Sequence, residues 1–191
     1  MTKLLLSLHV LAAVLAIGPV TVAASMFPKA LRSAHGNPGD REALATLRTL
    51  HRICRVYAGI GVSVPVLGFA TASSLGVLGS GWLITSIVLT TAAAAVLALL
   101  ILPAQDGALD AVQALDAVQA LDAVQALDAV QPLGATQALG AAQAPDTARP
   151  PGSGPGIRSA ARLAMLTGVF NLLWATVTVL MVIRPGSTTG A

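Results

Sequence analysis

A single histidine lies inside an uncharged apolar stretch, and its residue type is the best suited to chemistry in this sequence. His9 stands within the run from Leu4 to Phe27, LLLSLHVLAAVLAIGPVTVAASMF, which is bracketed by Lys3 and Lys29. An ionisable side chain in a stretch that crosses a bilayer is a functional hypothesis by default. The imidazole of His9 could ligate a haem iron, relay a proton or hydrogen-bond a quinone.

The two other histidines do not complete a haem site with His9. His35 and His51 fall in a polar stretch that the charge pattern places on the opposite side of the bilayer. Ligation would therefore need His9 from a second copy or an axial ligand of another type. The structural alternative is a neutral imidazole bonded to the fourth apolar stretch, with Asn171 as partner. His9 is the candidate cofactor-binding residue; we expect no cofactor and keep haem or quinone binding as the alternative.

Motifs of well-known enzymes are missing from the sequence, which contains no Walker loop, GxSxG elbow or HExxH pair. No carboxylate lies in the four apolar stretches, which argues against ion-coupled transport. The lone cysteine, Cys54, cannot form an intramolecular disulfide and is interpreted as a packing residue. Whether the chain is an enzyme is left open, with a non-enzymatic role favoured and no catalytic or metal-binding residue assigned.

The composition favours a membrane protein. Of 191 residues, 55 % are hydrophobic and 10 % are charged, whereas soluble domains average about 25 % charged residues. As a helix, the stretch from Leu4 to Phe27 would extend about 36 Å, which exceeds a hydrocarbon core of about 30 Å. A cleaved signal peptide is the rival interpretation, but its apolar region usually spans only about 7–15 residues.

The predicted fold is all-α, a polytopic four-transmembrane-helix bundle with a cytoplasmic low-complexity loop. The expected elements are helices at 4–27, 56–78, 82–103 and 161–183, a basic loop with an amphipathic helix at 28–55, and a partly disordered loop at 104–160. Pro19 predicts a kink in the first helix, and Pro103 predicts the end of the third.

Small residues recur at helical spacing on three of these helices, where they allow close approach of a neighbour. We expect the small face of the first helix to seat in a glycine-rich groove of the second. The residues expected to pack helix against helix are Ala12, Ala16, Gly61, Gly68, Gly168 and Asn171.

Four arginines form one face of the helix expected within residues 28–55. They are Arg41, Arg48, Arg52 and Arg55. We interpret them as a membrane-surface collar that lies in the interface and attracts anionic lipid. The alternative is an accessory subunit that uses the collar to dock an acidic partner protein.

Four identical copies of ALDAVQ occupy residues 108–131. A period of six turns an α-helix by about 240° per copy, so no single apolar stripe forms. We expect a partly helical arm that grades into disorder at 145–155, with acidic binding as the functional alternative. Deletion of residues 110–131 is expected to leave insertion and stability unchanged.

Positive charge predicts the orientation. The segments after the first and third helices hold nine Lys and Arg residues, against two at the chain ends, Lys3 and Arg184. The positive-inside rule therefore places both termini outside the cytoplasmic membrane. Because the positive charge is clustered in these segments, it indicates how the chain is oriented in the membrane. No nucleic-acid partner is therefore expected. The expected partners are the lipid bilayer and either a second copy or another membrane protein.

Residues 8–13, LHVLAA, followed by Gly18 and a basic loop, resemble the start of a bacterial family of integral membrane proteins, the domain-of-unknown-function family two-two-six-nine. The resemblance covers residues 4–103 and 160–183, with the hexapeptide repeat as an insertion. It implies a bacterial membrane protein with about four helices and a histidine in the first, and it implies no particular activity.

Overall fold

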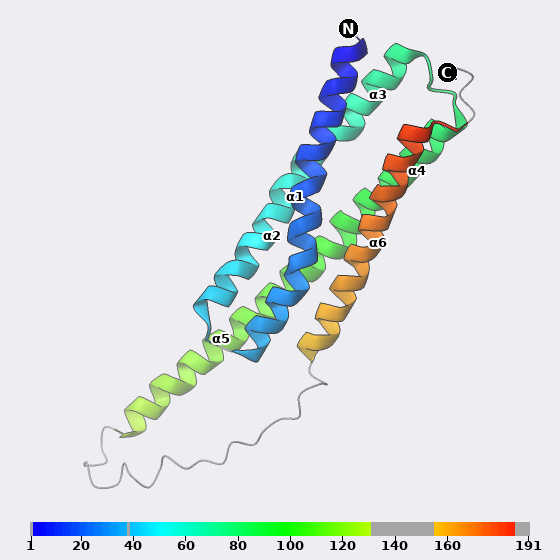
Figure 1. The fold of residues 1–191 in the computed structure, drawn as a ribbon. Coiled ribbons are helices and arrows are strands. Elements are labelled where there is room, and N and C mark those ends of the chain that lie inside the picture. Colours follow the sequence, from blue (N-terminus) through cyan, green and yellow to red (C-terminus); the bar gives the residue numbers. More distant parts are fainter. Residues whose placement is uncertain (1, 38, 131–154, 186–191) are drawn as a thin grey trace.

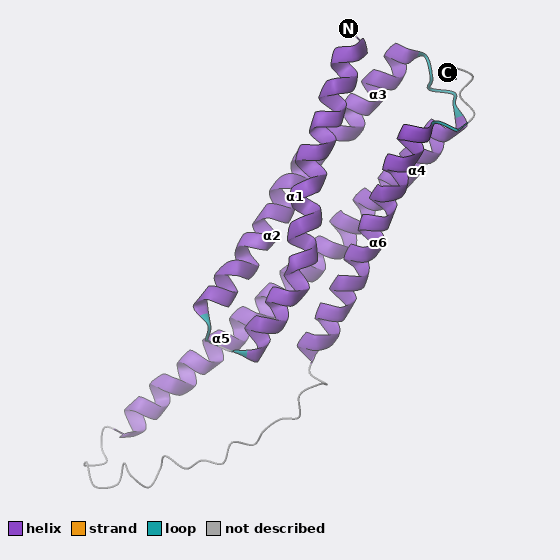
Figure 2. Cartoon of the chain, viewed as in Figure 1, coloured by secondary structure: helices purple, strands orange, loops and turns teal. Residues whose placement is uncertain are grey.

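The computed structural model of the protein describes residues 2–37, 39–130 and 155–185, and this part of the chain consists of helices joined by short turns, without a strand (Figures 1 and 2). In chain order the elements are α1 (Thr2–Gly36), α2 (Arg41–Gly61), α3 (Ser63–Leu75), α4 (Gly81–Ala95), the π-helix η1 (Val96–Ile101), α5 (Leu102–Val130) and α6 (Pro155–Ile183). Four helical stretches are long and apolar enough to cross a membrane: Thr2–Gly36, Arg41–Leu75, Gly81–Asp128 and Gly156–Ile183. The predicted all-α class and the number of such helices are confirmed.

The helices form an elongated bundle in which consecutive stretches run antiparallel (Figure 1). Helix α1 packs against α2, α3 and α6, while α4 packs against α6 and α5 packs against α2. The start of α1, the α3–α4 turn and the end of α6 lie together at what we name the α3–α4 end. The α1–α2 turn and the start of α6 lie at the opposite end, the α1–α2 end.

Local sequence explains where the second stretch begins, breaks and ends. Asp40 caps α2, because its carboxylate accepts hydrogen bonds from the backbone N–H groups of Glu42 and Ala43. The helix is interrupted at Val62, where Pro65 has no N–H to continue the backbone ladder. Gly76 ends α3 in the left-handed conformation, with φ of 67°, which glycine adopts without strain.

The basic segment runs along the bundle. Helix α1 continues through Pro28 to Gly36, and α2 packs lengthwise against it. From Arg41 to Arg55 the chain therefore rises along the bundle by about 21 Å at 1.5 Å per residue. The apolar side of α2 is therefore buried against α1, and the membrane-surface role of its arginines stays a prediction.

The third stretch does not end at Pro103. The α-helix changes to the π-helix η1 just before this proline. The N–H of Leu102 donates a hydrogen bond to the carbonyl of Leu97, five residues earlier. A π-turn changes the backbone register locally, so the proline ring is accommodated and α5 continues to Val130. The predicted stop at Pro103 is therefore wrong.

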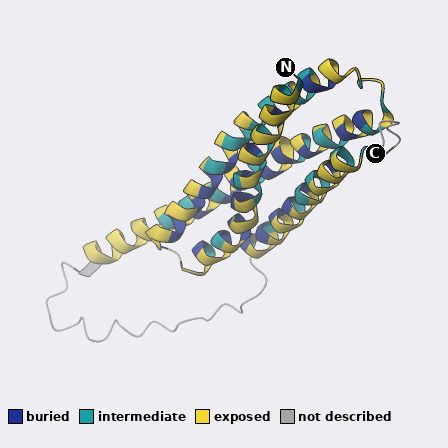
Figure 3. Ribbon diagram, turned by 45° about the horizontal axis from the view of Figure 1, so that its top comes forward, coloured by how far each residue is buried: buried dark blue, intermediate teal, exposed yellow. Residues whose placement is uncertain are grey.

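Most of the apolar core gathers towards the α1–α2 end. Phe27 and Leu31 of α1, Leu47 of α2 and Leu163 of α6 are almost fully buried in one cluster. A second, smaller cluster further along the bundle contains Phe170. Figure 3 shows buried residues along the inner faces of the bundle and exposed residues over the far part of α5.

Tertiary packing distinguishes the first copy of the repeat from the next two. Val112, in the first copy, is 2 % exposed, whereas Val118 and Val124, at the same place in the second and third, are 57 % and 54 % exposed. The burial of Val112 in the main apolar cluster argues against the expectation that residues 110–131 are dispensable, which stays a prediction. The predicted disorder at 145–155 lies outside the described residues, except that Pro155 begins α6.

The repeat offers a matched test of this core. Val112→Ala should lower the free energy of unfolding by about 2 kcal/mol, because it removes buried apolar volume. Val124→Ala, the same change within the same hexapeptide, should stay within about 0.5 kcal/mol of the parent. Unfolding in mild detergent measures both. Equal effects of the two substitutions would show that α5 does not pack against α2 as described.

Candidate functional site

A cavity of about 800 Å³ lies towards the α3–α4 end of the bundle, with walls from α1 and α3 on one side and α4 and α6 on the other. The lining is mainly apolar, and side chains such as Val14, Phe69 and Ile87 contribute to it. The two apolar clusters lie mainly elsewhere in the bundle. Buried side chains therefore do not fill the space between the helices in this part. Its volume is in the range of small-molecule pockets, about 300–1,000 Å³.

His9 lies in the wall of this cavity and is anchored to the neighbouring helix. Its Nδ1 is 3.0 Å from the carbonyl oxygen of Val64 on α3. The imidazole lies against Gly68, and a Cβ added to that glycine would be 2.9 Å from Cε1 of the ring. Since Gly68 stands one turn beyond Val64, its missing side chain opens the path by which the ring reaches the helix backbone.

The partner fixes the tautomer of the neutral ring. A carbonyl oxygen only accepts hydrogen bonds, so Nδ1 carries the proton and donates to Val64. Nε2 of His9 then holds the free lone pair, and among the described residues it has no hydrogen-bond partner. Histidines that ligate metals commonly have this arrangement, in which one N–H bonds a backbone carbonyl while the other nitrogen binds the ligand.

Asn171 does not pair with His9, contrary to the alternative that the sequence suggested. Its Nδ2 lies 3.5 Å from the hydroxyl of Ser25 on α1, nearer the middle of the bundle. The other amide atom, Oδ1, is buried without a partner in the described part of the chain, as is Nε1 of Trp174 one turn further. Asn171 therefore links α6 to α1, while His9 links α1 to α3.

A cation and an aromatic ring stand at the mouth of the cavity. Arg184 follows the last residue of α6, and its guanidinium carbon lies 5.7 Å from the ring centroid of Trp82 at the start of α4. Arg184 has a φ of 46°, in the left-handed region that ends many helices, and its N–H bonds the carbonyl of Leu180. Both Arg184 and Trp82 line the cavity.

The residues expected to pack helices have different surroundings. Ala16 is buried, and its Cβ lies 4.0 Å from the position of a Cβ added to Gly61. Ala12 is half-buried on the same side of α1. Gly168 is exposed, and a Cβ added there would meet nothing within 4 Å, so this glycine makes no helix contact in the structure.

The arginines of α2 are exposed, and two of them line a second cleft. The four are Arg41, Arg48, Arg52 and Arg55. Arg41 and Arg48 face Asp116 of α5 across a cleft of about 610 Å³. Asp116 accepts a hydrogen bond of 3.1 Å from the backbone N–H of Gly39 in the α1–α2 turn. The acidic repeat helix therefore contacts the basic hairpin of its own chain.

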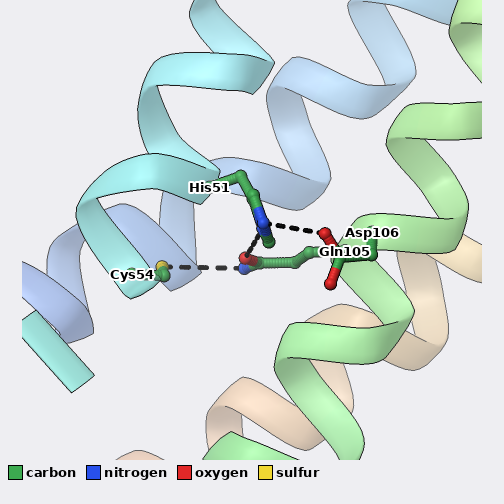
Figure 4. A network of polar contacts seen from close by, with 4 residues as sticks. All are labelled: His51, Cys54, Gln105 and Asp106. Atoms are coloured by element: carbon green, nitrogen blue, oxygen red, sulfur yellow. Dashed lines mark hydrogen bonds and ion pairs between the residues drawn. The ribbon is translucent and has the colours of Figure 1, made fainter. Parts of the chain in front are cut away.

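A buried polar cluster joins α2 to the first turns of α5 (Figure 4). His51 Nδ1 lies 3.2 Å from Oε1 of Gln105, and the Gln105 amide donates to the sulfur of Cys54 at 3.7 Å. His51 Nε2 lies 2.9 Å from Oδ1 of Asp106 but off the direction of a hydrogen bond, so the two side chains form an ion pair only when His51 is protonated. The cluster fixes the register of α5 on α2.

The three histidines have separate surroundings. His9 contacts α3, His51 contacts α5, and His35 lies against Gly156 in the first turn of α6. Among the described residues no group of three or more His, Cys, Asp or Glu side chains is arranged to hold a metal ion. A haem held at His9 would therefore take its second axial ligand from elsewhere.

Comparison with known proteins finds no matching family model, curated protein or solved structure. The resemblance of residues 4–103 and 160–183 to a membrane-protein family stays a prediction. The argument for a function therefore depends on the cavity and the side chains in its wall.

Sequence reasoning singled out His9 but not its surroundings. The carbonyl of Val64 has no sequence signal, because every residue carries one. Arg184 served in the sequence only as a charge that predicts orientation, and nothing in the sequence places Trp82 beside it. Gln105 and Asp106 follow Pro103, where the helix was expected to end.

The fit between His9 and Gly68 predicts a coupled pair of substitutions. Gly68→Ala should destabilise the protein by about 1–3 kcal/mol, because the new methyl group overlaps the imidazole. In a His9→Ala background the same change should be neutral or stabilising, since the ring is gone and alanine favours helix. Gly59→Ala, where an added Cβ meets nothing within 4 Å, is the control. A penalty that persists without His9 would contradict the contact.

Proposed function

We propose that this chain is a multi-pass membrane protein that binds a lipophilic small molecule in the cavity beside His9. The observation that carries the proposal is the free Nε2 of a histidine whose Nδ1 is already bonded to Val64, in the wall of an apolar cavity of about 800 Å³. In the bilayer a ligand would enter from the lipid, because the cavity lies between helices and its walls are apolar. The role is binding, and no catalytic residue is assigned.

Two ligand classes suit a neutral imidazole in apolar surroundings. Haem iron would take the lone pair of Nε2 as an axial ligand. A quinol hydroxyl would donate a hydrogen bond to the same nitrogen. In both cases the bond between His9 and Val64 orients the ring, so the second helix contributes through its backbone.

The proposed orientation has both ends of the chain outside the cytoplasmic membrane. The four apolar stretches return the chain to the end where it began. Eight of the nine Lys and Arg residues counted for the inside are Lys29, Arg32, Arg41, Arg48, Arg52, Arg55, Arg158 and Arg162, which the structure describes. They belong to the second half of α1, to α2 and to the start of α6, towards the α1–α2 end. The positive-inside rule then assigns this end to the cytoplasm.

Cysteine labelling tests this orientation. In a Cys54→Ala background, Gly79→Cys in the α3–α4 turn should react with a membrane-impermeant maleimide added to intact cells. Ser33→Cys, near the end of α1, should react only after the membrane is permeabilised. Both positions are exposed, so access to each depends on the side of the membrane. The reverse pattern would invert the topology, and reaction of both in intact cells would exclude the membrane location.

A visible absorption spectrum and a lipid extract of the purified protein test whether it carries haem or a quinone. Protein purified in mild detergent should carry either a Soret band or an extractable quinone, and His9→Ala should lose at least about nine-tenths of it. His35→Ala is the matched control and should keep the ligand, because His35 lies away from the cavity against Gly156. A folded protein that carries neither ligand, before and after supplementation of the cells with haem precursor, would contradict both classes.

A further inference from the structure

We infer that the ligand of the cavity is an amphiphile with an anionic head group, which binds Arg184 at the cavity mouth while the apolar body lies between the helices. This inference rests on the proposed function, because it names the chemical class of the molecule that occupies the same cavity. The shared chemistry is a carboxylate or phosphate joined to a large apolar body. A quinone lacks the anion, whereas the carboxylates of a porphyrin or the head of an acidic lipid supply it.

Among the described residues, Arg184 has no carboxylate to pair with at its end of the bundle. The acidic residues that the structure describes are Asp40, Glu42, Asp106, Asp110, Asp116, Asp122 and Asp128. These belong to the start of α2 or to α5, towards the α1–α2 end. The ion pair found in the described part of the chain joins His51 to Asp106. No described carboxylate therefore competes with an added anion for the charge of Arg184.

The position of Arg184 directs that charge to the cavity. The left-handed backbone at this residue ends α6 and turns the side chain over Trp82, on the first turn of α4. The guanidinium lies over the Trp82 ring and lines the cavity together with it. A guanidinium that stacks on an aromatic ring by its face still has its edge N–H groups to donate to a carboxylate or phosphate.

The remaining lining suits the apolar body. Beyond Arg184 and Trp82, the cavity continues along Met181 and Val177 of α6 and reaches Val14 and Ile17 of α1. A chain or ring that enters from the mouth thus meets mostly aliphatic side chains. His9 adds one hydrogen-bond acceptor part of the way along, which matches a ligand with a polar group in its body.

Both tryptophans of the protein line this cavity, so intrinsic fluorescence reports its occupancy directly. The sequence holds two tryptophans, Trp82 and Trp174, and no third residue of this type contributes background emission. Bromine quenches tryptophan over contact distances, so a brominated amphiphile that enters the cavity should quench both residues in a saturable way.

The experiment titrates protein in neutral detergent with dibrominated stearate and, separately, with the uncharged dibrominated stearyl alcohol, at a pH that ionises the acid. The acid should bind about three- to tenfold more tightly than the alcohol. Arg184→Gln should abolish that preference and leave binding of the alcohol unchanged. Lys3→Gln, which removes an exposed cation from the same end of the bundle, should keep the preference.

The outcomes separate this inference from the proposed function. Saturable quenching with equal affinity for acid and alcohol would overturn the anionic head and leave the lipophilic cavity intact. The inference of an anionic head group would also be overturned if Arg184→Gln retained the preference for the acid over the alcohol, or if Lys3→Gln abolished that preference equally. Quenching that never saturates with either probe, in a protein whose helical circular dichroism is unchanged, would overturn the cavity as a ligand site.

Discussion

The close approach of α1 to its neighbours is the interaction on which the rest of the structure depends. Helix α1 packs against α2, α3, α5 and α6, so its surface sets the spacing of the bundle. Along α3 that contact is made of small residues and one histidine, as where His9 lies over Gly68. Towards the α1–α2 end it is made of large ones, including Phe27 and Leu31. The bundle is therefore filled at one end and encloses a cavity towards the other.

The two most buried histidines, His9 and His51, each have a hydrogen-bond partner, which the apolar surroundings alone would not offer. His9 and His51 each obtain theirs from another helix, and in both cases an irregularity of the backbone lies close by. Val64 follows the break at Val62, and Gln105 follows the π-helix and Pro103. Interruptions of this kind are common where a helix carries a functional group, because they re-aim side chains and free carbonyls.

The distribution of charge follows the same division of the bundle. The described carboxylates are at the start of α2 and in α5, where Asp106 and Asp116 contact α2 and the α1–α2 turn. At the cavity end the described cations are Lys3 and Arg184, and no described carboxylate lies near them. A ligand that enters between the helices there would meet an apolar interior and a positive mouth, and this combination selects for an amphiphilic anion.

The sequence by itself determined the helical class, the four long apolar stretches and the choice of His9. Those features depend on composition and on the cost of an ionisable group among apolar residues, both of which are local. Tertiary structure decided which carbonyl His9 bonds, whether Pro103 ends a helix and which copy of ALDAVQ joins the core. Val112 and Val124 have the same hexapeptide around them, yet only Val112 is buried. Identical local sequence cannot encode that difference, because it arises from the neighbour that one copy reaches and the other does not.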